Sequence, residues 1–378
     1  MKASPSQETE QKKSTVDRGL LVTVLILVSI GLLMILSASS IRAIQDYNDA
    51  YFFFRRQLSF AGIGLLCMLF FSRIDYHNYL KHSRKIVLIA LFLLIIVLIP
   101  GVGQTAGGSR RWLDLGFFNF QTSEFAKLAV AIYVSSFISR KDDRIKTLVR
   151  GVIPPMIVVS SMFLLIALQP DFGTAFTIFA AAILMLIVGG IRIFHLGVVG
   201  MPVVLFMFYY ITSATYRMNR VLTFFDPWRD PKGSGYHIIQ SLMALGTGGL
   251  LGVGPGNSRQ KFLYLPEPGT DFIFAIIGEE MGLLGAAAVI MLFGYLAYRG
   301  IRISLDAPDV FGSLLASGLI IIIVIQAFIN IAAVTNIMPV TGITLPFISY
   351  GGSSLLMMMT AAGILLNISR HGIKREDK

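Results

Sequence analysis

The sequence has few charged residues and a single cysteine. Asp, Glu, Lys and Arg make up 14% of its 378 residues, whereas soluble domains carry about 25% because a folded surface must be wetted by water. Cys67 alone excludes a disulfide framework or a thiolate metal cluster within this chain. The five histidines are scattered and show no ligand spacing. The shortage of charge argues against an ordinary water-soluble protein.

Apolar side chains are what the sequence has in abundance. They make up 55% of the residues, and the mean hydropathy is +0.73. The net charge of +11 would suit nucleic-acid binding, but the basic residues lie in short loops between apolar runs, as anchors on anionic membrane lipids do. The chain is therefore predicted to lie in a bilayer and to bind lipids, and not nucleic acid.

Ten apolar stretches are long enough, or nearly so, to cross a bilayer, which takes about 20 residues in a helix. We therefore predict an all-α, polytopic membrane protein with ten transmembrane helices. The first stretch is too long for a removable signal peptide and lacks its small-residue cleavage site. The predicted spans are 19–39, 57–72, 86–100, 124–139, 151–168, 172–190, 194–212, 271–298, 309–335 and 345–368.

Lys and Arg are distributed unequally between the two sides of these spans. When the loops are assigned alternately, the side that holds both termini collects roughly 20 of them, against about 5 in the short loops of the other side. Both termini are therefore predicted to be cytoplasmic. Residues 1–17 are predicted to form a disordered cytoplasmic tail, 18–370 the transmembrane domain and 371–378 a second cytoplasmic tail.

Two long segments fall on the outer side of the membrane. They are 101–123 and 213–270, the latter between the seventh and eighth spans. Loops of this length usually carry function. Residues 236–246 alternate apolar and polar side chains at helical spacing, which predicts a helix lying in the plane of the interface.

The fourth span begins with two opposite charges, Glu124 and Lys127. Their i,i+3 spacing places them on one helix face, where they can neutralise each other. A charged side chain at membrane depth needs a partner, a wet cavity or a function. The pair is therefore either a structural ion pair or, with Arg110 and Arg111 just upstream, a source of positive charge facing an outer cavity.

The eighth span carries three carboxylates, at Asp271, Glu279 and Glu280. On a continuous helix Glu279 lies about 80° around the axis from Asp271, whereas Glu280 points to the opposite side. Glu279 is therefore the expected companion of Asp271. Asp271 is also placed to be a simple helix cap, because Thr270 and Asp271 both suit that position before an apolar run.

Glycine, proline and serine interrupt the apolar stretch that leads into the tenth span, with Ser349, Gly351 and Gly352 among them. Broken helices at membrane depth are tolerated only where the backbone is buried in protein or lines a cavity. Packing alone and a cavity lining both remain open as explanations.

Four strings in this order resemble the SEDS family, the shape, elongation, division and sporulation proteins. They are GSRRWLDLG with QTSEFAKL (108–128), QPDFGTA (169–175), NSRQKFLYLPEPGTDFIFAIIGEEMGLLG (257–285) and PVTGITLPFISYGGSSL (339–355). The likeness covers nearly the whole chain after the N-terminal tail and is greater to the FtsW/SpoVE branch than to RodA. Gly269 and Thr122 depart from the residues usual in the family, His and Pro respectively.

This resemblance implies a peptidoglycan glycosyltransferase that polymerises lipid II at the outer face of the bacterial cytoplasmic membrane. It also implies work with a class B penicillin-binding protein, within the machinery of cell division, elongation or sporulation. The essential aspartate of the family falls on Asp271.

The reaction suits the residues. Polymerisation joins a sugar hydroxyl to an anomeric carbon whose leaving group is a lipid diphosphate, so a single carboxylate acting as general base is sufficient. The departing diphosphate needs positive charge, from basic side chains or from Mg²⁺ or Mn²⁺ held partly by Asp271 or Glu267. The candidate cations are Arg110, Arg111, Lys127, Arg217, Arg220, Arg259 and Lys261.

Two other functions remain open from the sequence. A lipid II flippase would also use broken helices and intramembrane charges, although the unusual residues gather on the outer side only. A non-catalytic scaffold for a penicillin-binding protein would leave Asp271 with no role beyond capping. Liposomes that contain labelled lipid II distinguish the three functions. A glycosyltransferase forms polymer, a flippase moves the label across the bilayer without polymer, and a scaffold does neither.

Overall fold

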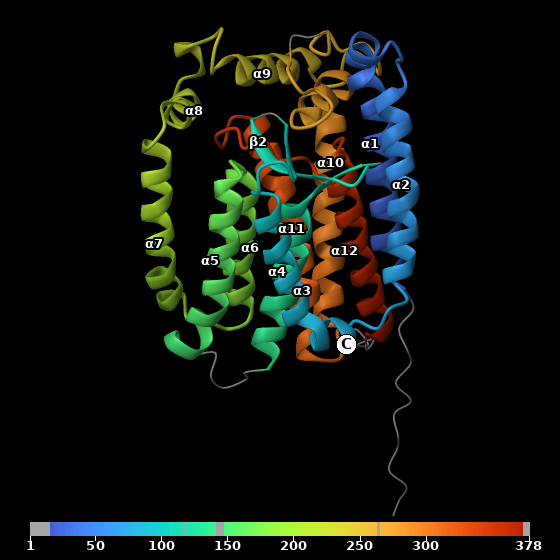
Figure 1. Ribbon diagram of the computed structural model, residues 1–378. Helices are drawn as coiled ribbons and strands as arrows, with labels where there is room; N and C mark the ends of the chain where they lie inside the picture. The colour runs from blue at the N-terminus through green and yellow to red at the C-terminus, as the bar shows by residue number, and fades with distance from the viewer. Residues whose placement is uncertain (1–15, 107, 117, 141–146, 263–264, 373–378) are drawn as a thin grey trace, which may run out of the picture.

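The computed structural model describes residues 16–106, 108–116, 118–140, 147–262 and 265–372, and most of both predicted tails lies outside these ranges. Ten helices of 16 residues or more occur in the described part, and each overlaps one predicted span. They form a bundle whose members run between its two ends (Figure 1). They are α1 (Arg18–Tyr47), α2 (Phe52–Phe71), α3 (His77–Ile96), α4 (Thr122–Ser139), α5 (Ile153–Leu168), α6 (Phe172–Val188), α7 (Ile193–Thr212), α10 (Ile273–Leu305), α11 (Val310–Val334) and α12 (Gly352–His371).

The predicted class, a helical multi-pass membrane protein, is confirmed. Among the described residues, six helical segments are long and apolar enough to cross a membrane by length and composition. The number of crossings, ten, stays a prediction. The start of α1 contacts the end of α12, because the Asp17 amide donates to Ser369 Oγ at 3.1 Å. The start of α1 and the end of α12 therefore meet at one end of the bundle. We call this end the cytoplasmic end, after the prediction from the distribution of Lys and Arg.

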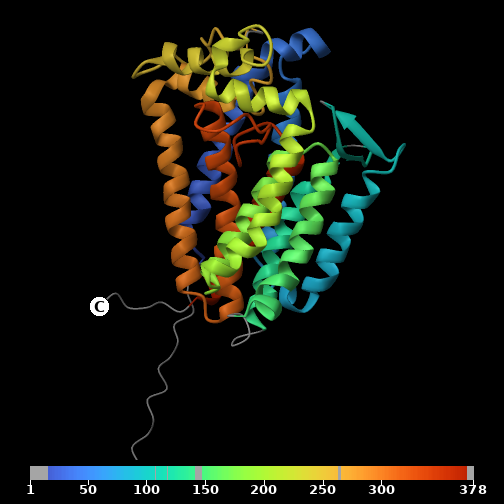
Figure 2. The same ribbon diagram turned by 90° about the vertical axis from the view of Figure 1, so that its left-hand side faces the viewer.

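The opposite, outer end carries the structure formed by the two long segments. Residues 101–123 contain a three-stranded antiparallel sheet that the sequence did not predict, made of β1 (Gly103–Ala106), β2 (Ser109–Asp114) and β3 (Asn119–Gln121). It projects at the edge of the outer end (Figure 2). The predicted helix at 236–246 is α9 (Tyr236–Gly248), which lies across the outer end of the bundle (Figure 1). It follows α8 (Thr215–Phe225), which was not predicted.

α10 is not the continuous helix that the span 271–298 implies. It is broken at Gly282, whose φ of 66° suits glycine. Residues 249–254 bond to the backbone at the break, where the Leu283 amide donates to the Gly249 carbonyl at 2.9 Å and the Val253 amide to the Glu279 carbonyl at 2.9 Å. The residues before the break, 273–281, therefore form a separate outer arm, tied to the segment after α9.

The tenth span also begins later than predicted. α12 starts at Gly352, and residues 345–351 form an irregular segment in which Phe347 has a φ of 65°. This segment is buried against α1, where a Cβ at Gly31 would lie 2.7 Å from the Ile348 carbonyl oxygen. The broken-helix prediction is confirmed, and the break is buried in protein.

Candidate active site at the outer end

Asp271 lies in a turn immediately before α10, and the turn is shaped by its proline-rich sequence. Glu267, between two prolines, has a φ of 54°. The Thr270 amide donates to the Glu267 carbonyl at 3.2 Å, and Arg42 at the outer part of α1 pairs with the Glu267 carboxylate at 2.8 Å. The approach to Asp271 is thereby held in one conformation.

The backbone around Asp271 is also fastened to the segment 339–351. Ser349 Oγ donates to the Thr270 carbonyl at 2.6 Å, and the Tyr350 amide donates to the Gly269 carbonyl at 2.8 Å. On α11, Asn330 Nδ2 donates to the carbonyl of Asp271 itself at 2.8 Å. The broken segment before α12 thus positions Asp271, and Ser349 contributes directly.

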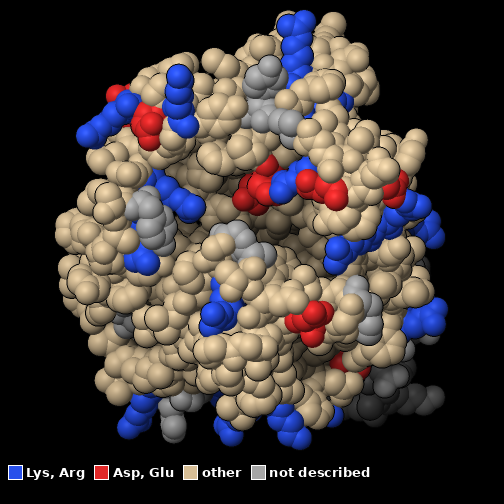
Figure 3. Space-filling view, turned by 45° about the horizontal axis from the view of Figure 1, so that its top comes forward, with Lys and Arg blue, Asp and Glu red and all other residues tan. Residues whose placement is uncertain are grey.

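Asp271 lines a cavity of about 390 Å³ at the outer end. Its walls come from α8, α9, the turn before α10 and residues 336–342, and the charged or titratable groups on them include Arg220, His237 and Glu267. Figure 3, in which the outer end is turned toward the viewer, shows acidic and basic side chains gathered around a hollowed region. Within the described ranges no hydrogen-bond donor is bound to the Asp271 carboxylate, so it is available to a ligand.

The surroundings of Asp271 favour a stronger base than an ordinary aspartate. Burial raises the pKa of Asp271 to about 6; the positive charge of Arg111 and Arg220 lowers it, while the negative charge of Glu267 and Asp171 raises it further. A carboxyl group with such a pKa remains largely ionised at neutral pH and accepts a proton more readily than an exposed one.

Arg110 and Arg111 separate because they are consecutive residues of β2, whose side chains alternate between its faces. Arg111 pairs with the fully buried Asp171 at 3.2 Å and acts electrostatically on Asp271. Arg110 instead donates to the Leu98 carbonyl at 3.4 Å. Of the two predicted cations, Arg111 is the one directed to the site.

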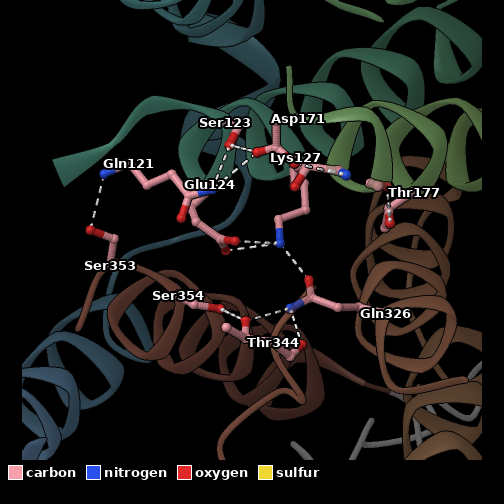
Figure 4. A network of polar contacts seen from close by, with 12 residues as sticks. Gln121, Ser123, Glu124, Lys127, Asp171, Thr177, Gln326, Thr344, Ser353 and Ser354 are labelled. Carbon is pink, nitrogen blue, oxygen red and sulfur yellow. Dashed lines mark hydrogen bonds and ion pairs between the residues drawn. The ribbon is translucent and has the colours of Figure 1, made fainter. Parts of the chain in front are cut away.

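Asp171 was quoted within a motif but not predicted as a site residue. It caps α6 by accepting from the Thr174 amide at 3.3 Å, and it also accepts from Gln121 Nε2 at 3.2 Å and from Ser123 Oγ at 3.3 Å (Figure 4). An aspartate between a proline and an apolar helix was the available signal, but it indicates only a cap. Its pairing with Arg111 required the tertiary structure.

Glu124 and Lys127 form a buried ion pair, and the alternative in which Lys127 faces an outer cavity is wrong. Their side chains are 4% and 2% exposed and the shortest distance between them is 2.8 Å. Lys127 Nζ also donates to Gln326 Oε1 on α11 (Figure 4). Because the ammonium is enclosed by these two partners, it is not placed to meet a diphosphate.

Glu279 does not accompany Asp271, contrary to the prediction. Its carboxylate accepts from Ser258 Oγ and from the Arg259 amide at 2.8 Å. Glu280 accepts from Ser37 Oγ at 2.6 Å and pairs with Lys261 at 3.2 Å. The reason is that Asp271 lies in the turn before α10 and not on the helix, so the angle of a continuous helix does not relate it to Glu279. Glu279 and Glu280 point to the segment 256–261 instead of the cavity. Lys261 is consequently buried in this cluster and is not a free cation.

The remaining predicted residues lie outside the cavity wall. The Arg217 guanidinium lies 3.5 Å from the centre of the Tyr210 ring. Arg259 is exposed, and its backbone amide binds Glu279. Gly351 and Gly352 have packing roles, since the Gly351 amide donates to Gln57 Oε1 at 3.3 Å and a Cβ at Gly352 would lie 2.5 Å from the Phe60 ring.

His237 and Arg42 belong to the site but were not predicted. The His237 ring stacks on Phe272, with centroids 6.0 Å apart. Burial and then the nearby charge of Arg220 lower the pKa of His237, against an opposite effect of Glu267, and so favour the neutral ring. A lone histidine on a surface helix carries no recognisable signal in the sequence, and neither does an arginine near the end of an apolar helix.

A divalent ion is compatible with the donors at the cavity. No group of three or more His, Cys, Asp and Glu side chains able to hold a metal occurs in the described part of the chain. Mg²⁺ in phosphate-transfer sites, however, often takes only one or two carboxylates and completes its shell with substrate phosphates and water. Asp271 and Glu267 would supply those carboxylates, although Glu267 is already paired with Arg42.

Comparisons with known proteins agree over nearly the full length. A family profile described as "Cell cycle protein" (FtsW, RodA, SpoVE) matches residues 18–374. Stage V sporulation protein E of Bacillus subtilis (strain 168) is 48% identical over 363 residues, covering 95% of this chain and 98% of that protein. A probable peptidoglycan glycosyltransferase FtsW of Geobacter sp. (strain M18) is 40% identical over 353 residues, covering 93% and 96%. A solved structure described as "Structural coordination of polymerization and crosslinking by a peptidoglycan synthase complex" superimposes with a TM-score of 0.78 at 28% identity, covering 95% and 99%.

Proposed function

This chain belongs to the FtsW/RodA/SpoVE family of cell cycle proteins, and from that premise we propose that it polymerises lipid II into glycan strands. It is a multi-pass protein of the bacterial cytoplasmic membrane and a peptidoglycan glycosyltransferase. The observation that carries the proposed mechanism is that the Asp271 carboxylate lies on the wall of the outer cavity with no hydrogen-bond donor bound to it among the described residues.

Asp271 acts as the general base. It takes the proton from the 4-hydroxyl of the acceptor sugar while that oxygen attacks the anomeric carbon of the donor and the bond to the lipid diphosphate breaks. Diphosphate is a weak base and leaves without protonation, so no second carboxylate is needed as an acid. A single displacement of this kind inverts the anomeric carbon, from the α-linked donor to a β-linked glycan.

Arg111 and Arg220 stabilise the departing diphosphate. Both act on the charge of Asp271, and Arg220 lines the same cavity. Fixed positive charge next to the leaving group lowers the barrier most where water is excluded. Lys127 and Lys261, which are enclosed by their own carboxylate partners, have no part in this step.

A bound Mg²⁺ or Mn²⁺ would add charge compensation at the diphosphate, with Glu267 or Asp271 among its ligands. Removal of divalent ions by EDTA should then lower the rate of polymerisation, and added Mg²⁺ or Mn²⁺ should restore it. An unchanged rate in EDTA would indicate that the arginines alone compensate the negative charge of the departing diphosphate.

The partner proposed for this chain is a class B penicillin-binding protein, which cross-links the new strand, within the division, elongation or sporulation machinery. The similarity to a structure of a peptidoglycan synthase complex supports this assembly. The measurement that tests it is co-purification of the two membrane proteins and polymerisation with and without the partner.

The test of the mechanism is Asp271→Asn, with products of purified lipid II resolved on a gel. The change keeps the size of the side chain and removes its basicity, so the rate should fall by about 10²–10⁴-fold. Folding should be retained, because the carboxylate has no donor to lose among the described residues.

Asp306→Asn is the matched control. Asp306 follows the opposite, cytoplasmic end of α10, so the same chemical change should leave the rate within about twofold. Wild-type polymer yield from the Asp271 variant would exclude this residue as the base, and label crossing liposomes without polymer would indicate a flippase instead.

A further inference from the structure

Asn330 is a buried polar residue on α11 that joins two separate walls of the active-site region. Its side chain is 2% exposed, and its amide nitrogen donates to the Asp271 carbonyl at 2.8 Å and to the Ile343 carbonyl at 2.7 Å. Both carbonyls lie outside helices and would otherwise need other donors. One side chain therefore connects the turn that carries Asp271 to the segment 339–351.

The wall next to Ile343 lies close to the Asp271 carboxylate. Gly342 has a φ of 71°, and a Cβ added there would lie 3.6 Å from Asp271 Oδ2. This is an ordinary van der Waals separation, so the wall at Gly342 lies directly beside the carboxylate. A small movement of either segment therefore changes the direction and the exposure of the base.

A second amide on the same face of α11 holds the same wall. Gln326, one turn before Asn330, donates from Nε2 to the Thr344 carbonyl at 2.9 Å and accepts from Lys127 through Oε1. Lys127 is in turn paired with Glu124 (Figure 4). Residues four apart on a helix lie on one face, so α11 fixes Ile343 and Thr344 together, and the ion pair orients Gln326.

The amide oxygen of Asn330 indicates that the role of this residue is not packing. It is buried and finds no donor in the part of the chain that the structure describes. A buried acceptor without a donor is unfavourable, and an apolar side chain of similar size would avoid it. What Asn330 contributes is the pair of donated hydrogen bonds.

We propose that Asn330 is a positioning residue for glycan polymerisation, which sets the Asp271 carboxylate against the cavity wall at Gly342, with Gln326 and Lys127 anchoring that wall. This inference rests on the proposed function. Loss of the two hydrogen bonds should lower kcat, because the base is displaced, and should leave KM nearly unchanged, because Arg111 and Arg220 are untouched.

The test compares Asn330→Leu with Asn367→Leu in the full-length protein reconstituted with its transpeptidase partner. Asn367 is an equally buried amide on α12, which donates to the Ser72 carbonyl at 3.0 Å and accepts from the Tyr76 amide at 3.0 Å. It lies near the cytoplasmic end of α12. It therefore reports the effect of losing a buried amide without touching Asp271.

We expect Asn330→Leu to lower kcat for lipid II by about 10–100-fold with KM changed less than about threefold. Asn367→Leu should lower the unfolding temperature while the folded fraction keeps its kcat. The pH profile is a second readout. If Asp271 moves away from the wall it becomes more hydrated, its pKa falls, and the acid limb of the Asn330→Leu profile shifts to lower pH.

A normal kcat and an unshifted acid limb in folded Asn330→Leu would overturn the inference. So would equal losses of kcat in the two leucine variants. If Asn330→Leu does not fold, Asn330→Ser, which keeps one donor, is tested in the same way, and a wild-type kcat and pH profile for it would also overturn the proposal.

Hydrogen exchange separates this inference from the proposed function. Faster exchange confined to the peptides around 267–272 and 341–345 in the Asn330 variants supports the positioning role even if the wild-type protein forms no polymer. In that case it is the assignment of polymerase activity that fails. Unchanged exchange in both peptides contradicts the positioning role whatever the activity.

Discussion

Asp271 and Glu279 stand at the two ends of the outer arm of α10 and differ in what surrounds their carboxylates. Asp271 lines a cavity, and no donor among the described residues binds its carboxylate. Glu279 accepts from Ser258 and from the Arg259 amide, and its neighbour Glu280 is paired with Lys261. The comparison shows that a buried carboxylate saturated with donors holds a structure together, whereas one facing a cavity is free to take a proton.

The Glu124 and Lys127 pair, like Glu279, holds the structure together. Breaking this pair should give the largest loss of stability. Glu124→Ala leaves the Lys127 ammonium buried, with Gln326 as its remaining partner in the part of the chain that the structure describes. Breaking a buried pair from one side costs about 3–5 kcal/mol. Thermal unfolding in detergent should show a marked decrease in unfolding temperature.

The double variant Glu124→Ala with Lys127→Met is the control for that prediction. Removing both charges should recover most of the lost stability, because apolar replacements of buried pairs are often neutral. If the double variant unfolds as early as the single one, charge is not the cause of the loss.

Glu279→Gln should come next in size and should affect stability instead of chemistry. The amide keeps one acceptor oxygen but weakens the bonds from Ser258 and the Arg259 amide, which are charge-assisted in the wild type. We expect a loss of about 1–3 kcal/mol, with the kcat of the folded fraction unchanged. A collapse of kcat comparable with that of Asp271→Asn would remove the distinction between the two carboxylates.

The pH dependence of the rate sharpens the comparison further. Asp271 must be ionised to accept a proton, and burial raises its pKa to about 6. The rate should therefore be steady above that pH and fall about tenfold for each unit below it. Polymerisation measured from pH 4.5 to 8 checks this, and a profile that stays level down to pH 4.5 would contradict a base with a raised pKa.

The two arginines Arg220 and Arg259 should show the smallest effects and the clearest contrast. Arg220 lines the cavity, whereas Arg259 is exposed and binds Glu279 through its backbone alone. Arg220→Ala should lower kcat/KM about tenfold through lost compensation of the diphosphate. Arg259→Ala should change it less than about threefold. The reverse order would place the leaving group near 256–261.

The sequence predicted the helices well because each apolar run reports on its own length and surroundings. All ten predicted spans overlap a helix, and α9 lies where periodicity placed it. The predictions failed where the backbone departs from a regular helix. α10 begins at Ile273, so Asp271 lies in the turn before it and the helical angle calculated from Asp271 to Glu279 does not apply. The sheet that separates Arg110 from Arg111 has strands too short to give a pattern.

Hydropathy and charge along the chain determined by themselves that this protein crosses the membrane repeatedly, and they predict that its unusual carboxylates and arginines lie near the outer side. These properties depend on whether each segment meets lipid or water, and the composition of a segment is enough to specify which of the two it meets. Only the tertiary structure decided which carboxylate is available for chemistry. Availability depends on whether donors from distant segments, such as Ser258 for Glu279 or Ser37 for Glu280, bind the group first. Those contacts exist only once the chain has folded.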